Sequence, residues 1–207
     1  MKSLSLVLLS LITFATGANA AVVINEIDLA NNRVELVNTG ASAVDISTWW
    51  WCNRVNGSPF YQSVGSNVSV IDNSLSTVGA TKTNFAAGAT LVMTVDPDFL
   101  PDVNGEFSIY NTNSFTSAAA IEDYVLWGSV GIRDIVAQNA GLWTDNQSID
   151  ISGLGAGQTL QANLGTTGNG PSEWFLADST LGSANIPEPT AALMGLLGFA
   201  LIFRRRK

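Results

Sequence analysis

Between residues 22 and 185 the chain is a series of short runs in which apolar and polar residues alternate, separated by clusters of Gly, Asn, Asp and Ser. Alternation at every second residue is typical of a strand with one buried face. The run 33–37 shows it most clearly, and Asn31-Asn32 between this run and the run 22–27 predicts a tight turn and a β-hairpin. Further strands are predicted at 44–46, 67–71, 90–95, 107–110, 123–127, 132–136, 148–151 and 158–161.

No stretch of this region repeats apolar residues with the helical period, so no helix is predicted in it. Short strands at regular spacing favour an all-β fold, either a β-sandwich or a partly open barrel. Roughly 165 residues are enough for one domain with its own core.

The first twenty residues have the three parts of a secretory signal peptide. Lys2 supplies a positive charge, residues 4–14 are apolar, and Ala18-Asn19-Ala20 is a small-residue cleavage site before Ala21. We therefore expect export and removal of residues 1–20 by signal peptidase. An uncleaved N-terminal anchor is the alternative.

Residues 186–207 form a second three-part segment. Pro187 and Pro189 restrict the backbone around Glu188 and favour an extended strip suited to a protease groove. Residues 191–203 are uncharged and mostly apolar, but a helix of this length covers only about 20 Å of the roughly 30 Å bilayer core. A terminal basic cluster follows, which the positive-inside rule keeps on the cytoplasmic side.

This arrangement resembles the PEP-CTERM sorting signal of bacterial exported proteins. The resemblance implies a short hydrophobic helix that holds the protein transiently in the inner membrane, and processing by exosortase, a membrane protease-transpeptidase. A plain membrane anchor that is never cut is the alternative. The sorting residues would be Pro187, Glu188, Pro189, Arg204, Arg205 and Arg206.

Three motifs near the start of the mature chain resemble the lamin-tail domain: Ile24-Asn25-Glu26-Ile27, then 34–40 (VELVNTG), then 44–49 (VDISTW). Residues 123–128 (DYVLWG), Trp174 and 181–185 (LGSAN) fit its later part, although Leu181-Gly182 stands where the family has Pro-Gly. The resemblance implies an immunoglobulin-like β-sandwich over residues 21–185. Residues 52–88 match none of its motifs.

Several residues have structural roles in this interpretation. Trp49, Trp127 and Trp174 are expected in the core, with their indole N–H groups bonded. Glu26 and Glu35 are expected to face solvent or to pair with the few cations.

The mature chain is strongly acidic. Residues 21–188 contain four cations, Arg33, Arg54, Lys82 and Arg133, against seventeen Asp and Glu residues, a net charge of −13. Such a surface repels nucleic acid and favours cations or cationic partners, and it also keeps an exported domain soluble.

The chain has no histidine, which removes the commonest general base, the usual zinc ligand and every Ser-His or Cys-His pair. Cys52 is the single cysteine, so no intrachain disulfide forms, and a small buried apolar side chain is its expected role. We expect no catalytic residue, no cofactor and no metal site.

The segment Asp96–Glu106 is the strongest argument for a metal site. Its oxygen-bearing side chains, Asp96, Asp98, Asp102, Asn104 and Glu106, are the kind that calcium prefers, but Gly105 stands two places early for a calcium loop. A turn between strands is the simpler interpretation. The alternative function is a secreted hydrolase or a calcium-dependent carbohydrate-binding module.

Trp49-Trp50-Trp51 is the most unusual local feature. On a strand, Trp49 and Trp51 share one face and Trp50 takes the other, where it could stack on sugar rings or be covered by a loop. The sequence as a whole predicts a non-catalytic interaction module that is exported to the bacterial cell surface or extracellular matrix. Exopolysaccharide and other surface proteins are candidate partners, whereas nucleic acid is not.

Overall fold

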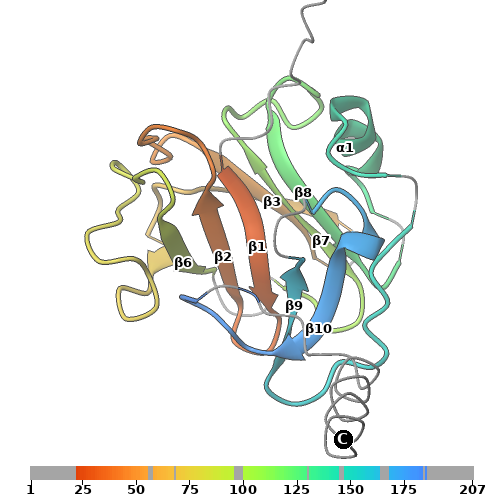
Figure 1. Ribbon diagram of the computed structural model, residues 1–207. Coiled ribbons are helices and arrows are strands. Elements are labelled where there is room, and N and C mark those ends of the chain that lie inside the picture. The colour runs from red at the N-terminus through yellow and green to blue at the C-terminus, as the bar shows by residue number, and fades with distance from the viewer. Residues whose placement is uncertain are drawn as a thin grey trace, which may run out of the picture.

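Two antiparallel β-sheets packed face to face form the framework of the described chain (Figure 1). The computed structural model describes residues 22–185 except 56–57, 68, 96–99, 130, 145–146, 164–167 and 184. The first sheet has the strand order β10-β9-β1-β2-β6-β5, and the second sheet has the order β4-β3-β7-β8. The expectation of a mainly β fold is confirmed. The strands are β1 (Val22–Asp28), β2 (Arg33–Asn38), β3 (Trp50–Val55), β4 (Ser58–Ser63), β5 (Val70–Ile71), β6 (Thr90–Thr94), β7 (Gly105–Tyr110), β8 (Ile121–Trp127), β9 (Gln158–Ala162) and β10 (Trp174–Asp178).

The predicted hairpin at the start of the domain is confirmed. β1 and β2 pair antiparallel from Val22 opposite Asn38 to Asp28 opposite Arg33. Asn32 in the turn has φ 52°, a left-handed conformation that asparagine tolerates better than most residues. Across the turn, Arg33 forms an ion pair with Asp28 at 2.6 Å.

A β-bulge in β1 links the two sheets. The register shifts between Ile24 and Glu26, and β9 pairs with β1 only at Glu26 and Ile27. The N–H of Ile24 instead donates to Asp123 Oδ2 on β8 at 2.5 Å. The buried Asp123 carboxyl group therefore joins an edge strand of the second sheet to the first sheet.

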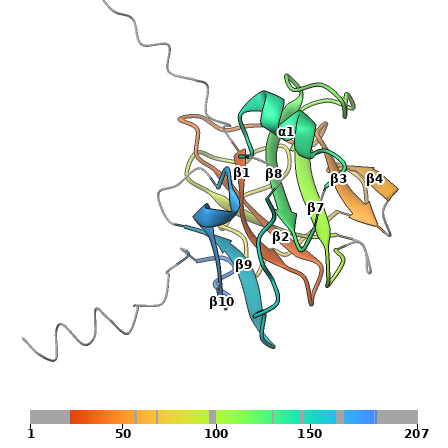
Figure 2. The same ribbon diagram turned by 90° about the vertical axis from the view of Figure 1, so that its right-hand side faces the viewer.

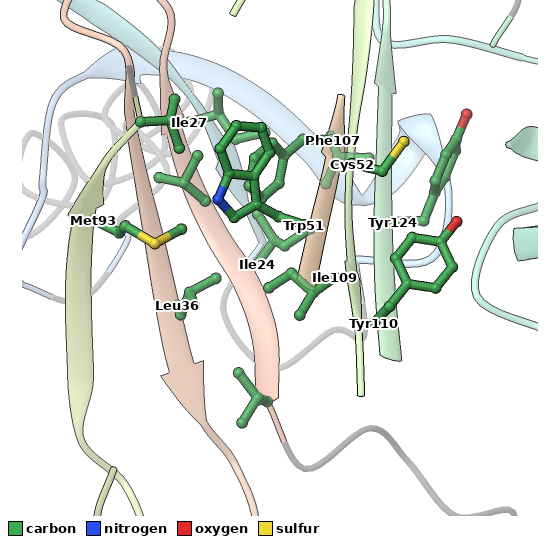
Figure 3. Close-up of a cluster of buried hydrophobic side chains, with 14 of the residues drawn as sticks. Ile24, Ile27, Leu36, Trp51, Cys52, Met93, Phe107, Ile109, Tyr110 and Tyr124 are labelled. Carbon is green, nitrogen blue, oxygen red and sulfur yellow. The ribbon is translucent and has the colours of Figure 1, made fainter. Parts of the chain in front are cut away.

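Large apolar side chains fill the space between the sheets. Figure 3 shows Trp51, Phe107 and Ile109 of the second sheet pointing toward Ile24 and Leu36 of the first sheet. The rings of Trp51 and Phe107 stack with centroids 5.7 Å apart. This packing is the main hydrophobic core.

The predicted tryptophan roles are confirmed by burial. Trp49, Trp127 and Trp174 all belong to the core. The indole of Trp127 donates to the carbonyl of Pro101 at 2.9 Å, and that of Trp174 donates to the carbonyl of Gly168 at 2.8 Å.

The strand predicted at 132–136 is wrong, because a helix, α1 (Asp134–Ala140), begins there. Its β-branched residues favour a strand locally, but Val136 and Ala137 are buried together on one helical face against β8 (Figure 2). Gly141 ends the helix with φ 74°, in the left-handed conformation typical of a C-terminal cap.

Other boundaries also differ from prediction. The runs 44–46 and 148–151 form only isolated bridges, at Val44 and Ile149, and the run 67–71 is reduced to β5. Three strands were not predicted: β3, β4, which contains Pro59, and β10, whose Trp-Phe-Leu-Ala does not alternate. β4 and β10 are edge strands, where proline is tolerated and the demand for a regular pattern is weak, whereas β3 lies inside its sheet.

Candidate functional site

The outer face of the second sheet carries an unusual set of buried polar side chains. Figure 3 shows Cys52, Tyr110 and Tyr124 pointing away from Trp51 and the sandwich interior. The register places Cys52 opposite Ser108, and Ser108 opposite Tyr124, in one row across β3, β7 and β8. We call this set the outer polar cluster; it consists of Cys52, Glu106, Ser108, Tyr110, Tyr124 and Arg133.

Glu106 organises the segment before α1. Its Oε2 accepts hydrogen bonds from the Tyr124 hydroxyl at 2.7 Å, from the N–H of Ile132 at 2.7 Å and from the N–H of Arg133 at 3.0 Å. Gly131 lies so close to Tyr124 and Glu106 that a Cβ atom there would clash with both side chains. A carboxyl group on β7 thus fixes the chain that enters the helix, although no side chain caps the helix locally.

Aromatic rings lie beside this cluster. Tyr61 stacks on Phe115 with centroids 3.9 Å apart, and Trp50 meets Phe115 edge-on at 5.9 Å. The Arg133 guanidinium lies 5.5 Å from the Tyr61 ring centroid and donates to the Tyr61 hydroxyl. Trp50, Tyr61 and Phe115 are half-buried, so Trp50 is neither a free platform nor a fully covered core residue.

Three atoms of the outer polar cluster are buried without a hydrogen-bond partner among the described residues: Glu106 Oε1, the Tyr110 hydroxyl and Arg133 Nε. An unpartnered buried polar atom costs about 1–3 kcal/mol, so three would together cost roughly 3–9 kcal/mol. That approaches the whole stability of a typical domain, about 5–15 kcal/mol.

Cys52 is the nucleophile candidate nearest to these groups. Burial and, to a smaller extent, the nearby Glu106 carboxyl group together raise the pKa of its thiol to about 12, against a smaller opposing effect of Arg133. The thiol therefore stays protonated at neutral pH and is a poor nucleophile. The prediction that Cys52 is a small buried side chain is confirmed.

A second buried polar set covers the outer face of the first sheet. Glu26 accepts hydrogen bonds from the Thr159 hydroxyl at 2.8 Å, the Ser179 hydroxyl at 3.0 Å, the Thr180 N–H at 3.0 Å and the Thr180 hydroxyl at 2.7 Å. We call residues 179–183 and Asn185, which lie over this face, the strap.

Glu35, opposite Glu26 in the register, holds the rest of the strap. It accepts from the Asn25 side chain and from the N–H of Gly182, both at 2.5 Å. Burial raises the pKa of Glu35 to about 7, while these two hydrogen bonds lower it. Asn185 donates to the carbonyls of Asn25 at 2.8 Å and Ala162 at 3.0 Å.

The expectation that Glu26 and Glu35 face solvent or pair with cations is wrong. Both side chains do lie on the outer face of their sheet, but the strap covers that face and both residues are fully buried. Hydrogen-bond donors of the strap take the place of cations. Nothing in the alternation of β1 and β2 reveals that a distant segment returns to cover them.

The acidic segment does not assemble a metal site in the part that is described. Residues 96–99 lie outside the described residues, Asp102 is exposed, and Glu106 points into the outer polar cluster. Within the described ranges, no group of three or more Cys, Asp and Glu side chains is placed to hold a metal ion. A groove of about 450 Å³ near Asp102, Gly128 and 148–152 brings Asp102 and Asp150 to one surface.

The signal and sorting residues cannot be placed in the same way. Ala18, Ala20 and Ala21, and Pro187, Glu188, Pro189 and Arg204–Arg206, lie outside the described residues. In the described part of the chain, no helix is long and apolar enough to cross a membrane.

The outer polar cluster was not identified from the sequence. The alternation Glu106, Ser108, Tyr110 along β7 does place three polar groups on one face, and this signal was available. Arg133 is distant from β7 in the sequence, and it contacts Glu106 only because the segment before α1 lies beside β7. Comparisons with family models, with curated proteins and with solved structures found no match.

Proposed function

We propose that this protein is an exported, non-catalytic interaction module, sorted at its C-terminal segment to the cell surface or the extracellular matrix. In this proposal, signal peptidase removes residues 1–20. The tail 186–207, with its short hydrophobic helix, is held in the inner membrane and then processed by an exosortase-like enzyme. The folded part is an immunoglobulin-like β-sandwich of the lamin-tail type.

The observation that carries the proposal is the position of the last buried residue before the tail. Asn185 is buried and hydrogen-bonded to β1 and β9, and Pro187 follows it by two residues in the sequence. The described fold therefore includes residues up to Asn185, directly before the proposed sorting signal, so that the two segments can be recognised by different proteins. The net charge of −13 over residues 21–188 suits an exported, soluble body.

The lamin-tail part of the proposal is supported by how its motif residues meet. Asn25 and Glu35 from the first two motifs contact Asn185 and Gly182 from the last one, and Glu26 bonds Thr180 directly before that last motif. Asp45 accepts from the N–H of Ser47 at 2.9 Å, as expected for a local turn. Motifs far apart in the sequence therefore form one structural unit.

Deleting residues 187–207 tests the sorting half of the proposal. We expect the truncated protein to lose its inner-membrane intermediate and to appear in a different fraction from the wild-type protein. Cell fractionation with mass spectrometry of the mature termini measures both the location and the cleavage points. An unchanged location, or a full-length tail in the mature protein, contradicts the proposal.

The rings of Trp50, Tyr61 and Phe115 are the surface that we propose for contact with a glycan such as the exopolysaccharide of the producing cell. They are half-exposed on the outer face of the second sheet, and Arg133 beside them supplies a hydrogen-bond donor. We expect Trp50→Ala to weaken binding to the purified polysaccharide about tenfold, the effect of losing roughly 1.4 kcal/mol.

Trp50→Phe is the matched control, because it keeps a ring against Phe115 and should retain most of the affinity. Glycan arrays or affinity electrophoresis would measure both variants, with thermal unfolding to show that they fold. Equal binding by the wild type and Trp50→Ala removes this surface from the proposal.

A further inference from the structure

The unpartnered atoms of the outer polar cluster belong to two residues of β7 and to the Arg133 side chain. Glu106, Ser108 and Tyr110 alternate on the outer face of β7, and all three are fully buried. The backbone N–H of Arg133 bonds Glu106, and its guanidinium bonds Tyr61 on β4. Because Tyr61 is opposite Cys52, and Cys52 is opposite Ser108, the Arg133 side chain crosses the sheet above the middle of this row.

The charged groups around the three unpartnered atoms limit which molecule could bind to these atoms. The Arg133 guanidinium disfavours a cation, and the Glu106 carboxyl group disfavours an anion. An apolar occupant would leave the three polar atoms unpaired. The occupant must be small and neutral, accept a hydrogen bond from Arg133 Nε and donate one to Glu106 Oε1. Water meets all of these conditions.

The side chains of this row converge. The Tyr110 hydroxyl lies beside Ser108 and interacts electrostatically with both Glu106 and Arg133. The three unpartnered atoms therefore belong to one buried polar region above β7, which ordered water can bridge.

We propose that the outer face of β7 holds a closed hydration site, in which ordered water molecules bond Glu106 Oε1, Arg133 Nε and the Tyr110 hydroxyl. These waters complete the hydrogen bonding of the cluster that fixes the chain entering α1. The site makes buried water a structural component of the second sheet, independent of the function proposed above.

A crystal structure of the full chain that resolves ordered water tests the site directly. We expect water density within normal hydrogen-bond distance of at least two of the three atoms. In a Tyr110→Phe variant, the water next to position 110 should be lost while the one at Glu106 remains. A dry space, a metal ion, or a protein side chain that bonds these atoms would overturn the proposal.

Nuclear magnetic resonance of the same chain tests whether the water is long-lived in solution. The Nε–H of Arg133 should show a cross-peak to water of the sign given by slowly exchanging, buried molecules. Arg33 is the matched control, because its Nε donates directly to Asp28 at 3.1 Å and should show no such signal. Equal behaviour of the two arginines would contradict a closed site.

Discussion

Replacing Glu26 with alanine should lower the free energy of unfolding by about 3–5 kcal/mol, because several neutral donors lose their acceptor together and each buried donor left unpaired costs about 1–3 kcal/mol. The carboxyl group of Glu26 accepts four hydrogen bonds, from Thr159, Ser179 and twice from Thr180. All of these donors lose their acceptor at once, and the Thr159 hydroxyl among them is buried. Against a typical total of about 5–15 kcal/mol, the loss is large.

The effect should concentrate in the strap. Hydrogen exchange in Glu26→Ala is expected to increase first at residues 179–183, whose donors bond Glu26 and Glu35, and much less in β3 or β7. Glu122→Ala is the control, because the half-buried Glu122 accepts a single side-chain hydrogen bond from Asn111 at 2.6 Å and should cost less than about 1 kcal/mol. Chemical denaturation measures both variants. A loss of under about 1 kcal/mol for Glu26→Ala would show that the strap does not depend on this carboxyl group.

The sequence predicted those features that depend on neighbouring residues. The β1–β2 hairpin follows from alternation and from Asn31-Asn32, and the burial of Trp127 and Trp174 follows from their size. The order of strands within each sheet could not be predicted. Alternation of apolar and polar residues shows which face of a strand is buried, but it does not show which other strand pairs with it.

Features that depend on distant residues were missed or reversed. α1 begins where Glu106, 26 residues away, accepts the N–H of Ile132, and local β propensity pointed to a strand instead. Glu26 and Glu35 look like surface residues until the strap returns over them from 147 or more residues away. In each case a buried carboxyl group bonds backbone N–H groups far along the chain. A sequence pattern shows such a carboxyl group but not its partners.

Two buried carboxyl groups give the domain a pH dependence opposite to that of ordinary acid denaturation. Burial raises the pKa of Asp123 to about 8, although the N–H groups of Ile24 and Tyr124 oppose the shift, and it raises the pKa of Glu35 to about 7. Their ordinary values are 3.8 and 4.5. Because the folded state holds these protons more tightly than the unfolded state, stability should fall as pH rises from about 4 to about 8.

Each such group contributes a slope of at most about 1.4 kcal/mol per pH unit between its unfolded and folded pKa values. We therefore expect the domain to be most stable near pH 4–5 and to lose stability progressively up to about pH 8. Below that optimum the trend should reverse, because hydrogen bonds from Ser47 and Ser74 lower the pKa values of Asp45 and Asp72.

Asp123→Asn isolates the contribution of the carboxyl group that joins the two sheets. The amide oxygen can still accept the N–H of Ile24, so the β1–β8 contact survives, but the side chain no longer titrates. Denaturation midpoints measured at intervals from pH 4 to pH 8 should fall less steeply in this variant than in the wild type. Asp102→Asn removes an exposed carboxyl group that is not among those acting on Asp123, and it should keep the wild-type slope. If Asp123→Asn and the wild type lose stability in parallel over that range, the Asp123 carboxyl group is ionised throughout and its hydrogen bonds outweigh its burial.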